Sequence, residues 1–66
     1  MKILLQCVRT QNYVRAVGMW TAVPEQALEF TEVVSALDFA LEHGLTGVRP
    51  VIRSDYSVAE VYLSVF

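Results

Sequence analysis

The fold is decided by the stretch TEVVSALDFALEHG, residues 31–44. When its residues are placed every 100° around a helix, the apolar ones form one broad face, made up of Val33, Val34, Ala36, Leu37, Ala40 and Leu41. Phe39 falls on the opposite, polar arc, so we expect it either to be covered by a loop or to contribute to a contact surface. Thr31 is a suitable N-cap, and Gly44 suits a left-handed C′ position with Leu45 folding back as in a Schellman motif. The pattern predicts an amphipathic helix over 32–43.

Short segments on both sides of this helix have the alternation and the β-forming composition that are typical of strands. Before the helix we expect strands at 2–9 and 13–17, a short extended piece at 19–21 and one helical turn at 24–28. After the helix we expect strands at 48–53 and 58–66. The polar residues 10–12, Gly18 and residues 54–57 suit the turns.

One helix and four main strands predict a single two-layer α+β domain over residues 1–66, with a ββαββ order. Strand 58–66 is the most apolar, so we expect it inside the sheet, parallel to strand 2–9. Pro50 cannot donate a ladder hydrogen bond, which favours an edge position for strand 48–53. The resulting order is 2-1-4-3, as in β-grasp-like domains. The expected core consists of Ile3, Leu5, Cys7, Phe30, Val33, Leu37, Ala40, Leu41, Val61, Leu63 and Val65.

The second face of this sheet is the expected interaction surface. It would carry Leu4, Val8, Tyr62 and Phe66, and a single helix covers only the other face. The chain has 66 residues, of which 55% are hydrophobic and 18% charged, which is more apolar material than one small core hides. Exposed apolar patches usually mark interaction sites. We therefore expect this face to mediate homodimerisation or the binding of another protein.

Part of the chain resembles a pattern found in short bacterial and phage proteins. In these proteins a tyrosine hairpin precedes Gly-x-Trp-Thr, an Ala-x-x-Phe segment and an amphipathic helix. The matching residues here are Tyr13, Val14, Gly18, Trp20, Thr21, Ala27, Phe30, Ala36 and Phe39. The resemblance implies the same order of elements and a framework role for Trp20 and Phe30, and it assigns no site residues.

Few residues in the sequence suggest a catalytic or metal-binding role. Cys7 is either a nucleophile or a small buried hydrophobe, and His43 is either an acid–base or metal-binding group or a cation at a helix C-terminus. Asp38 and Glu42 stand four residues apart on the polar side of the predicted helix. Two hydrated carboxylates on a solvent-facing helix surface need no catalytic role. Glycine-rich phosphate loops and triad patterns are absent from the sequence. We expect a non-enzymatic protein with no cofactor and no metal. The single cysteine excludes an internal disulfide and fits the cytoplasm.

Nucleic-acid binding is the alternative. Arginines stand on predicted strands or strand ends at Arg9, Arg15, Arg49 and Arg53, and Tyr13 and Tyr62 are available to stack on bases. The net charge of −2 disfavours this role, because nonspecific binding depends on neutralising phosphates. No apolar stretch approaches the roughly 20 residues of a membrane span. The leading expectation is a small cytoplasmic domain of a bacterial type that acts through protein contacts; the alternative is a weak nucleic-acid-binding or regulatory module using Arg9, Arg15 and the sheet aromatics.

Overall fold

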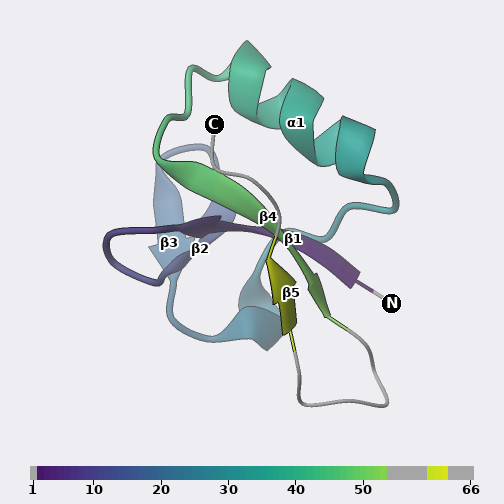
Figure 1. Ribbon diagram of the computed structural model, residues 1–66. Coiled ribbons are helices and arrows are strands. Elements are labelled where there is room, and N and C mark those ends of the chain that lie inside the picture. The colour runs from purple at the N-terminus through teal and green to yellow at the C-terminus, as the bar shows by residue number, and fades with distance from the viewer. Residues whose placement is uncertain (1, 54–59, 63–66) are drawn as a thin grey trace.

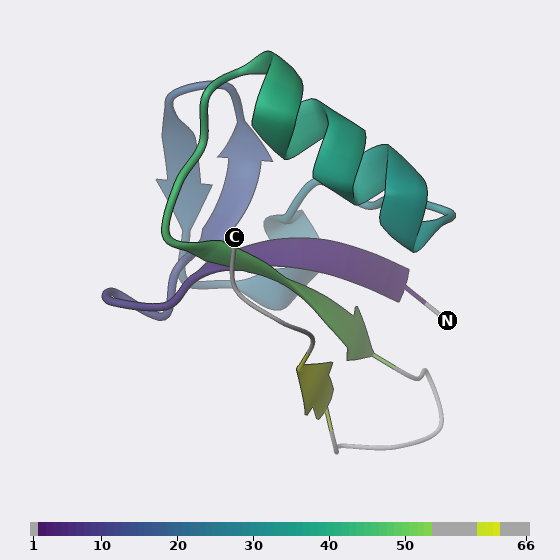
Figure 2. The same ribbon diagram turned by 45° about the horizontal axis from the view of Figure 1, so that its top comes forward.

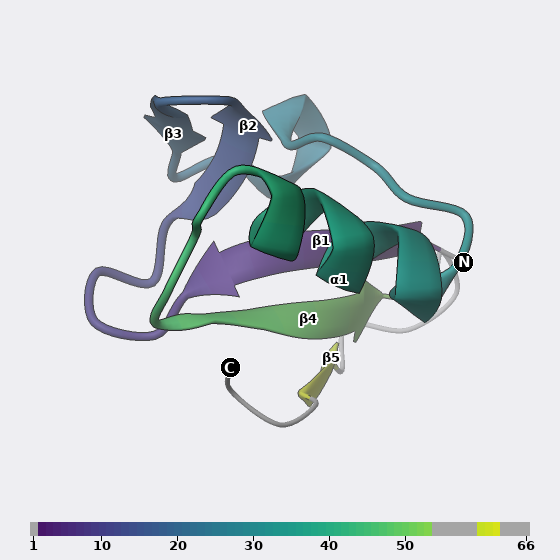
Figure 3. The same ribbon diagram turned by 90° about the horizontal axis from the view of Figure 1, so that it is seen from above.

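A five-stranded antiparallel sheet with one helix on it forms the described part of the protein (Figure 1). The computed structural model describes residues 2–53 and 60–62. Its elements are β1 (Lys2–Cys7), β2 (Tyr13–Ala16), β3 (Met19–Thr21), the 3₁₀ turn η1 (Pro24–Gln26), α1 (Val33–Glu42), β4 (Val48–Arg53) and β5 (Glu60–Tyr62). Seen from above, α1 lies over β1 and β4 and runs roughly along them (Figure 3). The expected α+β architecture of a helix on a sheet is confirmed.

The strand order is β3-β2-β1-β4-β5, and it corrects the expected position of strand 48–53. β4 is an inner strand that pairs with β1 in the antiparallel sense from Lys2↔Arg53 to Cys7↔Val48. β5 lies outside β4 and pairs with it from Val51 to Arg53. Within residues 2–53 and 60–62, the first and last strands are therefore not paired in parallel as we expected, and β3 adds a strand beyond β2.

Pro50 is tolerated inside the sheet because of the register of β1 and β4. The Val8 N–H donates to the Gly47 carbonyl at 3.0 Å, so these residues form a hydrogen-bonded pair. Hydrogen-bonded and non-bonded pairs alternate along an antiparallel ladder, which makes Leu5↔Pro50 a non-bonded pair. The Pro50 nitrogen thus points away from β1, and no bond between these two strands is lost. Its ring is fully buried.

The main core lies between α1 and the sheet. Its buried members are Ile3, Leu5, Val14, Ala36, Ala40 and Val48, with Phe30, Val33, Phe39, Leu45 and Ile52 packed against them. Leu37 and Cys7 are half-buried. The expected core member Leu41 is 75% exposed, so that prediction is wrong. The side chain of Val61, and the residues Leu63 and Val65, lie outside the described part.

The helix is rotated relative to the face that its sequence pattern predicts. Phe39 packs edge-on against Phe30, with 5.4 Å between ring centroids, and therefore turns towards the sheet. Burying a large aromatic ring contributes more than burying an aliphatic side chain at the other margin of the face. Val34 consequently points outward with 62% exposure, together with Leu41. Phe39 is thus partly buried against the main core, and of the two alternatives left open by the sequence the structure favours packing.

Both ends of α1 lie close to their predicted positions. Glu32 rather than Thr31 is the N-cap, and it makes no side-chain capping bond. Gly44 has a positive φ of 64°, as expected at C′. The Leu45 N–H donates to the Ala40 carbonyl at 2.8 Å, and the Gly44 N–H donates to the Leu41 carbonyl at 3.3 Å. These two bonds confirm the Schellman motif.

The chain returns from the β2–β3 hairpin through a segment that joins the sheet beside β1. The Leu28 N–H donates to the Val14 carbonyl at 2.9 Å. Ile3 and Phe30 exchange backbone bonds of 3.3 and 2.8 Å. This path leaves η1 on the opposite side of the sheet from α1 (Figures 1 and 2). The expected helical turn at 24–28 is therefore present over Pro24–Gln26, and it helps to cover the second face.

Candidate interaction surface

The second face of the sheet is covered at the position where the sequence predicted an open apolar surface. Leu4 is fully buried in a second cluster with Tyr13 and Ala27, the residue that follows η1. Val8 is half-buried. The Tyr62 side chain and Phe66 lie outside the described part. Leu4 is therefore removed from the expected interaction surface, because η1 and its neighbours already occupy the space above it.

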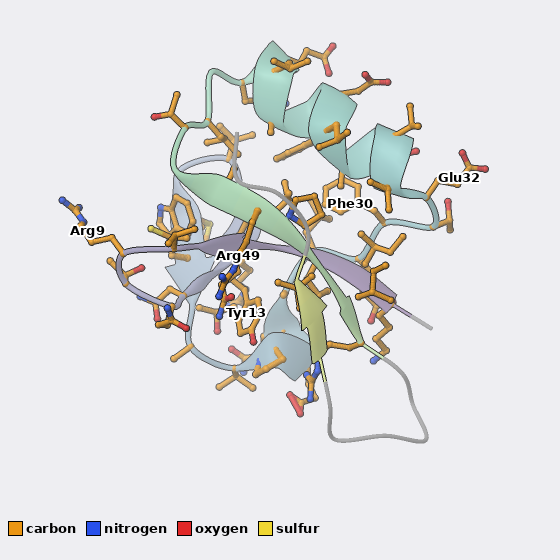
Figure 4. All side chains as sticks on the ribbon, in the orientation of Figure 1. Arg9, Tyr13, Phe30, Glu32 and Arg49 are labelled. Carbon is orange, nitrogen blue, oxygen red and sulfur yellow. The ribbon has the colours of Figure 1, made fainter. Side chains whose placement is uncertain are left out.

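A polar row crosses this second face. The strand registers align Thr21, Tyr13, Gln6 and Arg49 across β3, β2, β1 and β4. Both Nε and Nη2 of Arg49 donate to Oε1 of Gln6, at 3.2 and 3.0 Å. Arg49 and Tyr13 point away from α1 (Figure 4). The Arg49 guanidinium is therefore held by the domain's own amide group.

The Gln6 side chain also ties the row to the turn after β1. Its Nε2 donates to the Gln11 carbonyl at 3.2 Å, and Gln11 Nε2 donates to the Val8 carbonyl at 3.0 Å. Gln11 adopts a positive φ of 66°, which these bonds help to hold. Among the described residues, every buried side-chain nitrogen or oxygen has a hydrogen-bond partner. Gln6 thus links Arg49 on β4 to the turn that follows β1.

The residues that suggested a nucleic-acid surface are described in part, since the side chain of Tyr62 lies outside the described residues. Tyr13 is only 6% exposed, so its ring has no face on which a base can stack. Arg9 and Arg15 are exposed, and Arg9 projects from the turn after β1 (Figure 4). Arg53 is half-buried, as is Arg49.

Cys7 stands at the end of β1, half-buried rather than enclosed under the helix as we expected. Hydrogen bonds from the Thr10 hydroxyl and the Thr10 backbone hold the pKa of the Cys7 thiol below its usual value, against the opposing effect of burial. The Arg9 charge acts in the same direction. His43 instead packs on Phe39, with 4.5 Å between ring centroids, and it extends the edge of the helix core. Within residues 2–53 and 60–62, no three acidic, histidine or cysteine side chains converge on a metal position.

Large apolar side chains are exposed at the β2–β3 hairpin and just beyond it. Val17 is 57% exposed, Met19 51%, Trp20 43% and Val23 45%; we call these four residues the hairpin patch. Residues 16–24 contain no charge, which is the sequence signal for this patch. The sequence reasoning missed it because Trp20 was expected to be a framework residue.

The hairpin patch borders an open edge, since β3 is the terminal strand of the described sheet. Trp20 pairs with Val14, whose side chain lies in the main core, so Trp20 stands on the helix side. Met19 is the next residue along the strand and therefore points to the other side. Exposed apolar groups thus flank both sides of the edge.

Val34 and Leu41 are also exposed, but they stand two turns apart on α1. The exposed acidic residues Asp38 and Glu42 lie on the same outer side of the helix. Apolar residues scattered singly over a surface are ordinary. The hairpin patch is consequently the stronger candidate for an interaction surface.

Comparison with known proteins gives no matching family model, no matching curated protein and no matching solved structure. In the described residues, no helix has both the length and the apolar character needed to cross a bilayer.

Proposed function

We propose that this chain is a non-enzymatic domain that acts through protein contacts, and that the hairpin patch makes them. The observation that carries the proposal is the exposure of Met19 and Trp20 beside an open sheet edge. Methionine and tryptophan are enriched at protein interfaces, and tryptophan is enriched among the residues that carry most of the binding energy. The cytoplasm is the setting we propose, since a single half-buried thiol fits a reducing compartment.

The distribution of polar groups supports a binding role over catalysis. The Gln6 side chain donates to Gln11 and accepts from Arg49 on the second face, and these bonds stabilise the sheet. Cys7 has a polarised thiol, but its hydrogen-bond partner Thr10 is not a general base. The hairpin patch combines exposed apolar area with a backbone edge, and both are typical of surfaces that other proteins cover.

Site-specific photocrosslinking in cells tests this role. A benzophenone amino acid placed at position 19 should crosslink to one defined protein, either another copy of this chain or a different protein. The same probe at position 34, which is exposed on α1, is the matched control. Trp20→Ser in the position-19 protein should remove the crosslink. Equal crosslinking from positions 19 and 34, or a product that persists in Trp20→Ser, would contradict the proposal.

A further inference from the structure

The Trp20 backbone N–H and C=O face outward from the open edge, and this direction indicates what kind of partner the edge can pair with. The Leu28 N–H donates to the Val14 carbonyl, so the polar backbone groups of Val14 point towards the β1 side. Alternation along the ladder makes Val14↔Trp20 a non-bonded pair. The N–H and C=O of Trp20 therefore point outward, past the edge of the described sheet. An extended backbone is the ligand that satisfies one donor and one acceptor at this spacing.

The edge has few of the features that natural sheets use to prevent such pairing. Exposed edge strands are commonly protected by lysine, proline, a bulge or a covering loop. β3 contains neither charge nor proline, and the bulge at Arg15 lies on β2. Shortness is its main protection, since β3 spans only Met19–Thr21. A short unprotected edge favours limited and reversible pairing.

We infer that the partner at this edge is a second copy of the same chain, paired antiparallel through β3 about a two-fold axis at Trp20. This inference rests on the proposed function and deepens it. Each copy offers one donor and one acceptor at Trp20, and two-fold pairing satisfies both through reciprocal Trp20–Trp20 bonds. Met19 then lies opposite Thr21 of the partner subunit, and the two indole rings lie side by side on the helix side of the joined sheet.

Charge and size are consistent with this pairing. Residues 16–24 carry no charge, so two copies with a net charge of −2 each approach without like charges in the contact. A three-residue strand contributes little area, which places the dimer in the weak class below about 1,200 Å² of buried surface. Self-association should therefore depend on concentration.

The experiment is sedimentation analysis across a wide concentration range with a backbone-modified chain. A chain of 66 residues is accessible to chemical synthesis, so Trp20 can carry an N-methyl group that blocks its N–H while the indole is retained. Two reciprocal hydrogen bonds are lost, and the association constant should fall roughly 10–100-fold. Far-UV circular dichroism checks that the domain remains folded. Leu41→Glu changes an exposed apolar residue on α1 and should leave association unchanged.

Each other outcome overturns a defined part of the inference. A wild-type chain that stays monomeric at every concentration excludes the second copy as partner; the crosslinks from position 19 then decide whether the proposed function survives with a different protein. A dimer that persists in the N-methyl chain excludes strand pairing at Trp20. Dispersal by Leu41→Glu would place the interface on α1 instead.

Discussion

Two leucine side chains of this domain have opposite environments, and their replacement measures which surfaces are packed. Leu4 has no exposed surface, whereas Leu41 is 75% exposed. Leu4→Ala should lower the free energy of unfolding by about 2–5 kcal/mol, because burial is lost and a cavity is left. Leu41→Ala should change it by less than about 0.5 kcal/mol. Urea unfolding of dilute protein provides both values, and Leu4→Val is the milder substitute if Leu4→Ala does not fold. A Leu4→Ala effect as small as that of Leu41→Ala would show that the second face is loosely covered.

Cys7 should react with alkylating reagents at a lower pH than an ordinary thiol does. The Thr10 hydroxyl bond stabilises the thiolate and lowers the pKa. Thr10→Val should raise this pKa and slow iodoacetamide labelling near neutral pH. Thr46→Val, at an exposed threonine, is the control. Because the folded pKa lies below the unfolded value, the unfolded state binds more protons between the two values, and the free energy of unfolding should rise with pH over that interval. The thiolate contribution is lost as pH falls through the folded pKa. Identical labelling profiles for wild type and Thr10→Val would exclude the hydrogen bond as the cause.

The C-terminal end of α1 depends on the backbone conformation of one glycine. Gly44 has a φ of 64°, and a Cβ added there would meet no other atom within 4 Å. The cost of Gly44→Ala is therefore conformational, and it should be about 1–2 kcal/mol in urea unfolding. Gly44→Asn should cost less, since asparagine tolerates the left-handed region better. An alanine variant as stable as wild type would mean that the Schellman turn contributes nothing.

Elements set by local signals were predictable from the sequence, and their arrangement was not. The turn at Gly44 and Leu45 follows from adjacent residues, so it was found. The position of Pro50 depends on which way its nitrogen points, and the bond between Val8 and Gly47 fixes that direction. This register is a long-range property that no local pattern contains. The rotation of α1 depends in the same way on the contact between Phe30 and Phe39.

The candidate site was missed at the scale of the whole molecule for a related reason. The sequence predicted a single helix, which can cover only one of the two faces of the sheet. Leu4 was therefore expected on an uncovered face. The 3₁₀ turn at Pro24–Gln26 was recognised in the sequence, but its position across the sheet follows from the Leu28–Val14 and Phe30–Ile3 bonds. Among the described residues, covering the second face in this way leaves the hairpin patch, at the end of the sheet, as the exposed apolar surface to which we assign the proposed contacts.

The proposed weak dimer should make the thermal stability of the whole molecule depend on its concentration. Association stabilises the folded state by mass action, and above the dissociation constant a tenfold rise in concentration should raise Tm by about 3–6 °C in a domain of this size. Trp20→Ser removes the reciprocal indole contact, so its Tm should vary less with concentration, while Leu41→Ser should behave as wild type does. Calorimetric scans of the three proteins at matched concentrations measure this slope. A wild-type Tm that stays constant over a thousandfold range would leave the edge of β3 unpaired in solution, and the two buried clusters of the single chain would then have to stabilise the fold without a partner.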